Sequence, residues 1–325
     1  MNYIDSVKQL ARTNAFKCVP RRNEDMNHIM PFFEIRKNDL GNLDISGYNY
    51  SKHDNSTRMV FWEQYMRNAI LPHIKNKDGI CGFYQIELHD SINYLIPENY
   101  HPINTNYDNV FTFCKKKYNR TSPLLPDMYF MTNWNNKNTY SDTVPYEQKD
   151  DRVRFYGTTT GGMSPHRNLR LHLCQWAIGR QDYDFKITNI AQMKENDIID
   201  YYKDEWSHMY SPSRVSQEEQ TKSKFLLNVD GNCSRWDIWD LKTNCLSFKY
   251  YSEDMLFYYP LLRNKEHFIE VTTDNLENMR LFYKNNYRDA TRISQNANAF
   301  SEEFLKPITH ILYTIELFDT IAQNK

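Results

Sequence analysis

From residue 153 onward, short apolar segments alternate with segments whose apolar residues recur at helical spacing. Strands are predicted at 153–156, 185–191, 223–231, 245–250 and 267–271, and helices at 168–176, 237–243, 275–285 and 300–323. Strands that are separated by helices pair in parallel, because each helix returns the chain to the edge of the sheet from which it started. The pattern therefore predicts an α/β fold, with an open parallel sheet and helices on both faces.

The first part of the chain is less regular. An amphipathic helix is expected within residues 1–25, an irregular polar stretch at 25–60 and a helix at 57–74. Further strands are expected at 82–91, 110–117 and 126–134, and a long loop at 135–151. Since 325 residues exceed the usual length of one domain, we predict domains at 1–150 and 151–300, followed by a helix at 301–325 that packs back on the first.

Charge and cysteine usage exclude several classes of protein. Forty basic against 41 acidic residues give a net charge of −1, which provides no basic face for nucleic acid. The six cysteines lie far apart without metal-ligand spacing, which favours reduced, packed thiols. The sequence has neither a secretory signal nor an apolar run long enough to span a membrane, so we expect a cytoplasmic protein.

The segment FYGTTTGG (Phe155–Gly162) follows a predicted strand and precedes a predicted helix. Its glycines allow a ligand to approach the backbone, while the threonine hydroxyls and the free N–H groups of the helix start can bind anionic oxygens. Arg167 and Arg170 could add positive charge. The spacing matches no standard phosphate loop, and an ordinary turn between a strand and a helix would satisfy the same pattern.

The segment DGNCSRW (Asp230–Trp236) follows a second buried strand. Asn232 and Ser234 can cap a helix that begins near Arg235. A helix N-terminus beside an arginine suits a pyrophosphate leaving group, because both stabilise the negative charge that develops on it. A capped helix with an exposed arginine is the simpler alternative.

Both segments follow the carboxyl end of a strand, where ligands bind in open parallel sheets. We therefore expect them in one site, in the cleft between two domains. A third segment, YYPLLRNKEHFIEV (Tyr258–Val271), places two tyrosines and a proline before a strand. Packing between domains explains that segment equally well.

Five segments in order resemble glycosyltransferase family 90: LPDMYFMTNW, FYGTTTGG, KSKFLLNVDGNCSRW, NCLSFK and FYYPLLRNKEHFIEV. The resemblance runs from Leu125 to Asn285 and is closest to members from large algal viruses. The family also includes protein O-glucosyltransferases, capsule-associated xylosyltransferases and lipopolysaccharide-modifying enzymes. The resemblance implies two Rossmann-like domains facing across a cleft (GT-B type). The implied reaction is inverting transfer of xylose or glucose from a UDP-sugar to a glycan or protein hydroxyl, with no obligatory metal and no other cofactor.

By resemblance, Arg235 contacts the diphosphate, with Gly231, Asn232 and Ser234 around it and Thr158–Thr160 near the nucleotide. Lys249 ends the next strand and could also reach a phosphate. The predicted donor site comprises Gly157, Thr158, Thr159, Thr160, Gly161, Arg167, Asp230, Gly231, Asn232, Ser234, Arg235, Lys249 and Tyr258.

An inverting enzyme also needs a base that takes the proton of the acceptor hydroxyl. In the related O-glucosyltransferases an aspartate after the LPDM-type strand has this role, whereas this chain reads Asn133-Trp134-Asn135-Asn136 there. Asp90 is the best substitute, with His89 assisting or orienting it, unless Asp90 is an ordinary loop or capping residue. Asp127 is second, although it starts its strand and so lies at the wrong end.

Two further hypotheses remain open. The asparagines at the expected base position suit a binding protein for nucleotide-sugars or carbohydrates that has lost catalysis. Asp182-Tyr183-Asp184 has the DxD form with which metal-dependent glycosyltransferases hold Mn²⁺ or Mg²⁺. A DxD sequence is frequent by chance and an arginine-based site makes a metal unnecessary, so we predict no metal ligands.

Overall fold

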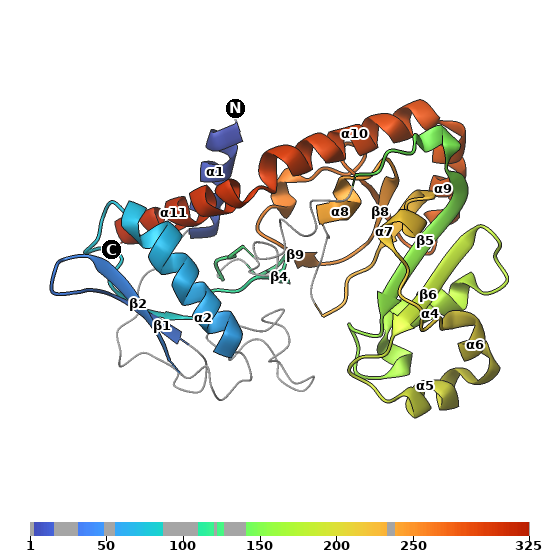
Figure 1. Cartoon of the computed structure of the whole chain (residues 1–325), viewed down its shortest axis with the longest axis horizontal. Coiled ribbons are helices and arrows are strands. Elements are labelled where there is room, and N and C mark those ends of the chain that lie inside the picture. The colour runs from blue at the N-terminus through green and yellow to red at the C-terminus, as the bar shows by residue number, and fades with distance from the viewer. Residues whose placement is uncertain are drawn as a thin grey trace. The chain divides into compact units, whose positions relative to one another are not determined.

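The computed structural model describes residues 3–15, 32–48, 56–86, 110–119, 122–126, 141–232 and 238–324. The chain divides into two compact units (Figure 1). Unit 1 comprises Met1–Trp134, Glu253–Pro260 and Phe304–Lys325, and unit 2 comprises Asn135–Ser252 and Leu261–Glu303.

Unit 2 is built on a parallel sheet with the strand order β10-β8-β7-β5-β6. The strands are β5 (Asp150–Thr158), β6 (Tyr183–Asn189), β7 (Ser223–Asn228), β8 (Leu246–Tyr250) and β10 (Ile269–Val271). Counted along the chain, the order is 2-1-3-4-5, a doubly wound order that reverses between β5 and β7. The predicted α/β class, its parallel sheet and all five predicted strands are confirmed.

The core explains why these segments become central strands. In β7 three successive residues, Phe225, Leu226 and Leu227, are buried, as expected for a strand that is covered on both faces. The ring of Phe225 stacks on that of Phe248 in β8, with centroids 5.1 Å apart. Burial of such rings is the main source of stability for the sheet.

Helical segments precede, connect and follow the strands of unit 2. They are η6 (Tyr146–Gln148), η7 (Pro165–Arg167), α4 (Leu169–Ala177), α5 (Glu195–Tyr202), η8 (Lys203–Glu205), α6 (Trp206–Met209), α7 (Gln217–Gln220), α8 (Ile238–Leu241), α9 (Leu276–Asn285) and α10 (Tyr287–Phe304). The helices predicted at 168–176 and 275–285 are confirmed as α4 and α9. The single helix predicted at 300–323 is wrong, because α10 ends at Phe304 and α11 (Pro307–Gln323) begins at a proline. Proline suits the first turn of a helix and cannot continue the preceding one.

Unit 1 combines α1 (Tyr3–Ala15), α2 (Ser56–Tyr65), a π-helical turn η3 (Met66–Ile70), η4 (Leu71–His73) and α11 with short strands. The segment η9 (Tyr259–Leu261) lies at the border of the two units. The strands are β1 (Phe32–Lys37), β2 (Leu43–Tyr48), β3 (Gly82–Gln85), β4 (Lys115–Lys116) and β9 (Asp254–Met255). The sheet β2-β1-β3 is antiparallel, and single parallel bridges join Ile86 to Phe111 and Thr112 to Leu124. The continuous helical run from Ser56 to His73 confirms the helix predicted at 57–74.

The irregular stretch predicted at 25–60 is wrong where the structure describes it. Residues 32–48 form the hairpin of β1 and β2 around a turn in which Gly41 has φ +73°. Phe33, Ile35 and Ile45 are buried, so apolar residues do alternate through this polar segment. The high content of Asn and Asp concealed that alternation.

Helix α11 packs on α1 within unit 1. Arg12 Nε donates to Glu316 Oε1 at 2.7 Å, and the ring of Phe318 stacks on Phe111 with centroids 5.4 Å apart. No helix among the described residues has the length and apolar character that a membrane span requires.

Candidate donor site at the switch point of unit 2

The loops that follow β5 and β7 meet at the point where the strand order of unit 2 reverses. The two strands are paired neighbours, with Val153 opposite Phe225. Beyond their carboxyl ends, the backbone N–H of Gly161 donates to the side-chain oxygen of Asn232 at 3.0 Å. The two segments singled out in the sequence therefore lie side by side, at the edge where ligands bind in doubly wound sheets.

Arg170, in the first turn of α4, joins both loops. Its Nη1 donates to Thr160 Oγ1 at 2.8 Å and to the carbonyl oxygen of Thr158 at 3.2 Å. Its Nη2 and Nε donate to the carbonyl oxygens of Val229 and Asp230 at 2.8 and 3.2 Å. One guanidinium thus fixes the position of both loops relative to α4. The sequence indicated Arg170 only as an additional charge; its position after the Gly/Thr loop was the one available signal.

Glycines are required where the two loops touch. Gly161 has φ +93°, and a Cβ atom there would lie 2.9 Å from the carbonyl oxygen of Gly231. A Cβ atom on Gly231 would lie 2.6 Å from Thr160 Oγ1. These glycines therefore allow loop-to-loop contact, in addition to the close approach of a ligand that the sequence suggested.

The hydrogen-bonding groups of Thr159 are engaged by other residues of the protein. Its buried hydroxyl donates to the carbonyl oxygen of Ala191 and accepts from the N–H of the same residue, both at 2.7 Å. Its carbonyl oxygen accepts from Asn168, whose side-chain oxygen caps α4 by accepting from Leu171 N at 3.0 Å. Asn168 was not among the predicted site residues, and it sets the start of α4 directly against the loop.

Lys249 and Asp230 form an ion pair at the ends of β8 and β7. The Lys249 side chain is 6% exposed, and its Nζ also donates to Asn228 Oδ1 at 2.8 Å. Asn228 in turn donates to Asp240 Oδ2 at 3.1 Å. The Lys249 charge is therefore balanced within the protein, and its predicted contact with a phosphate stays a prediction.

The other predicted residues are spread more widely. Gly157 is half-buried in β5, Thr158 and Thr160 are half-buried with their hydroxyls 3.1 Å apart, and Arg167 is exposed at the end of η7. Tyr258 belongs to unit 1, where it is buried against the ring of Phe257.

Several predicted residues lie outside the described part of the chain: Ser234, Arg235, Asp90, His89, Asp127 and the segment 133–136. Their roles stay predictions. The helix expected to begin near Arg235 is described only from Ile238, where α8 starts.

The DxD residues lie at the opposite end of the sheet from the two loops. They stand at the amino-terminal start of β6, where Asp184 is paired with Arg154 of β5. Asp182 Oδ2 is 2.9 Å from Arg280 Nη2, and Asp184 accepts a hydrogen bond from the Tyr156 hydroxyl. Within the described residues no group of three or more His, Cys, Asp or Glu side chains could hold a metal.

The arrangement at the switch point suits an anionic ligand. Asn168 takes the Leu171 N–H at the start of the nine-residue α4, and the start of the helix adds the positive end of a helix dipole. The hydroxyls of Thr158 and Thr160 and the backbone of Gly161 and Gly162 lie beside it. A nucleoside diphosphate carries oxygens that such groups bind.

No protein-family model and no curated protein matches the chain. Among solved structures, Anabaena HepE, in complex with UDP-glucose, is similar with a TM-score of 0.35 and 12% identity over 50% of this chain and 47% of HepE. The C-terminal domain of LpcC, a group 1 glycosyl transferase of Francisella tularensis, is similar with a TM-score of 0.31 and 10% identity over 54% of this chain and 92% of that one. The matched region spans about half the length of HepE. Both scores are below 0.5, so the function has to be inferred from the residues of the site.

Proposed function

We propose that this protein is a glycosyltransferase that binds the diphosphate of a nucleotide-sugar at the switch point of unit 2. One observation carries the proposal: the loops after β5 and β7, both in segments that resemble glycosyltransferase family 90, contact each other at the switch point. The N–H of Gly161 donates to Asn232, and Arg170 donates to both loops. Gly161 and Asn232, which are 71 residues apart in the sequence, meet at the edge of the sheet where ligands bind in doubly wound folds.

We further propose UDP-glucose or UDP-xylose as the donor and inversion at the sugar carbon. In that reaction the acceptor hydroxyl attacks C1, a base takes its proton, and the bond between C1 and the diphosphate oxygen breaks with its electron pair going to UDP. The α4 N-terminus and Arg235 would stabilise the charge that develops on UDP, without a metal. Asp90 is the proposed base, and Asp127 the alternative.

A binding experiment tests the donor. Melting of the full chain is measured with UDP, UDP-glucose, UDP-xylose and GDP-glucose, where a ligand at 100 times its Kd adds about 2.7 kcal/mol. We expect the three uridine compounds to raise the melting temperature and GDP-glucose to do so less. Equal melting temperatures with and without every nucleotide would contradict the proposal.

A second candidate function is binding without transfer, which the asparagines at 133, 135 and 136 favour because an amide cannot accept the acceptor's proton. Release of UDP from UDP-glucose and UDP-xylose separates the two candidates. Turnover that Asp90→Asn abolishes, while UDP affinity stays within twofold, supports transfer with Asp90 as base. Donor binding without any turnover supports the second candidate.

A further inference from the structure

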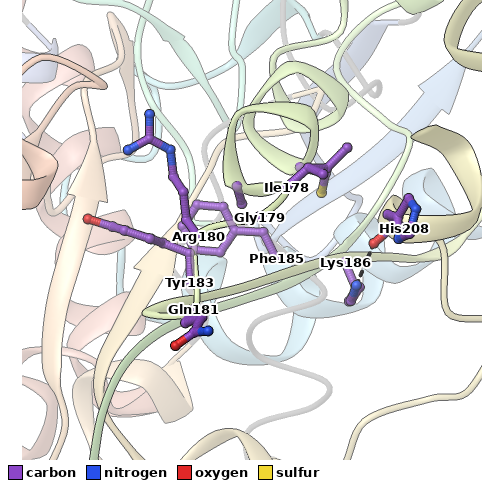
Figure 2. A pocket seen from close by; sticks show the side chains of 10 residues that line it. Ile178, Gly179, Arg180, Gln181, Tyr183, Phe185, Lys186 and His208 are labelled. Carbon is purple, nitrogen blue, oxygen red and sulfur yellow. Dashed lines mark hydrogen bonds between the residues drawn. The ribbon is translucent and has the colours of Figure 1, made fainter.

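Unit 2 contains a cavity of about 380 Å³ between the C-terminal end of α4 and the edge strand β6 (Figure 2). This is the other end of α4 from the donor loops, so the cavity is separate from the proposed donor site. Its volume lies in the range of small-molecule sites. It is lined by Cys174, Ala177, Ile178, Gly179, Arg180, Gln181, Tyr183, Phe185, Lys186 and His208.

The inner wall of the cavity is apolar. Cys174 and Ala177 of α4 and Phe185 of β6 are all buried, and Ile178 continues the wall. Burial raises the pKa of the Cys174 thiol, so this side chain stays neutral and behaves as a small apolar group. Because the three buried side chains expose little surface, the half-buried Ile178 offers the apolar contact that a ligand can reach.

The rim is basic. Arg180, Lys186 and His208 line the cavity, while no aspartate or glutamate is among the lining residues. The nearby carboxylates of Glu277, which accepts from the hydroxyl of Tyr183, and of Asp182 both pair with Arg280 at 2.9 Å, and neither lines the cavity. The field at the mouth of the cavity consequently favours an anion.

Two of the basic side chains are held in place. Lys186 Nζ donates to the carbonyl oxygen of His208, as the dashed line in Figure 2 shows. An ammonium group has three donors, and this carbonyl takes one of them. Arg180 Nε donates to the carbonyl oxygen of Trp176 at 3.0 Å, with the guanidinium 4.2 Å above the Trp176 ring. Held donors lose less entropy when a ligand binds.

We propose that this cavity binds a small organic anion, with its carboxylate or phosphate on Lys186 and its apolar part against the half-buried Ile178. The inference rests on the cavity alone and does not depend on the proposed transferase activity.

The test uses the full chain and three probes: benzoate, its neutral analogue benzamide, and acetate, which has the charge without the apolar part. Saturable binding is followed by calorimetry or by ligand-observed NMR. We expect benzoate to bind at least about tenfold more tightly than either other probe, since each lacks one of the two interactions.

Two substitutions locate the binding. Lys186→Gln removes the charge, and Gln181→Glu adds a repelling charge at an exposed rim position where it leaves the core intact. Each should weaken the binding of benzoate about tenfold. Lys194 is exposed and lies outside the cavity, so Lys194→Gln should leave the affinity for benzoate unchanged. Equal binding of benzoate and benzamide, no benzoate binding, or insensitivity to both rim substitutions would overturn the proposal. UDP titrations on the same samples report the donor site separately.

Discussion

The two ends of the parallel sheet in unit 2 differ in the partners of their arginines, although Arg154, like Arg170, also donates to a backbone carbonyl oxygen, that of Glu219. At the amino-terminal end, Arg154 is 2% exposed and forms ion pairs with Asp150 at 2.8 Å and with Glu219 at 3.4 Å. At the carboxyl end, the loop contacts of Arg170 go to carbonyl and hydroxyl oxygens of two loops. The first arginine closes a network of charges, and the second shapes loops that border a proposed ligand site.

This difference explains why similar residue types have different roles. Carboxylates cluster at the amino-terminal end, where Asp182 and Asp184 are engaged by Arg280 and Tyr156. Glycines and threonines cluster at the carboxyl end, where the strand order reverses. A DxD sequence at the first end stabilises the fold, whereas at the second end it would face the site.

Arg154→Met should have the largest effect on stability. It removes the ion pairs of the buried Arg154 with Asp150 and Glu219. We expect a loss of about 3 kcal/mol, at the low end for a buried pair because Asp150 is partly exposed and keeps its pair with Arg152 at 2.9 Å. Chemical denaturation measures the loss. UDP affinity, measured well below the melting temperature, should stay within twofold. The matched control is Lys222→Met, which breaks an exposed pair with Glu219 at the same end and should cost less than about 0.5 kcal/mol.

Arg170→Met should cost less stability and far more affinity. The lost hydrogen bonds come from a charged donor, and we expect a destabilisation of about 2 kcal/mol. Because the loops would no longer be held together, UDP should bind about 100-fold more weakly, equivalent to about 2.7 kcal/mol. Calorimetric titration with UDP checks this. If Arg154→Met and Arg170→Met reduced affinity equally, the contrast between the two ends would be wrong.

Much of this contrast could be predicted from the sequence, but not all of it. The buried runs that became β5 and β7, and the Gly/Thr and Asp-Gly-Asn segments after them, follow from local patterns and from the rule for ligand sites in parallel sheets. The hairpin of β1 and β2 was missed because its polar residues outnumber the few buried ones. Local patterns thus locate strands well where they are buried on both faces.

Contacts between segments that are distant in the sequence could not be predicted from it. Nothing local indicates that Lys249 pairs with Asp230, since periodicity does not give the register of neighbouring strands. The same holds for Arg170, whose acceptors Thr158 and Val229 lie on two loops and are 71 residues apart in the sequence. Lys249 was therefore predicted as a phosphate ligand, and Arg170 was left out of the predicted site.

Gly161→Ala tests whether the loops need their close contact. Gly161 and Gly41 both have positive φ, but only Gly161 has another loop within reach of an added Cβ atom. We expect Gly41→Ala to cost about 1 kcal/mol from backbone strain, and Gly161→Ala about 2 kcal/mol. UDP affinity should fall about tenfold for Gly161→Ala alone. Equal affinities for the two variants would mean that the loop contact has no part in binding.

The smallest expected effect is on the pH dependence of stability, and it comes from Asp151 at the amino-terminal end of the sheet. Burial raises the pKa of Asp151, but hydrogen bonds from Lys224 and Lys284 outweigh it and hold the pKa below its usual value of 3.8. A folded-state pKa below that of the unfolded chain gives stability that is present above the unfolded value and is lost as the pH falls through the folded one. The ion pairs with Lys224 and Lys284, at 2.6 and 2.9 Å, should therefore stabilise unit 2 at pH 7 and fail in acid.

Asp151→Asn isolates this contribution. Since Asp151 is partly exposed, we expect the melting temperature at pH 7 to fall by only about 1–2 °C. The difference from the unmodified protein should shrink as the pH falls below the unfolded-state pKa of Asp151, and it should vanish only below the lowered folded-state pKa, where both chains are neutral at this position. Melting curves between pH 7 and pH 3 measure it. A difference that does not shrink between pH 7 and pH 3 would assign the effect to packing, and a loss of UDP affinity at pH 7 would show that the amino-terminal end also supports the loops.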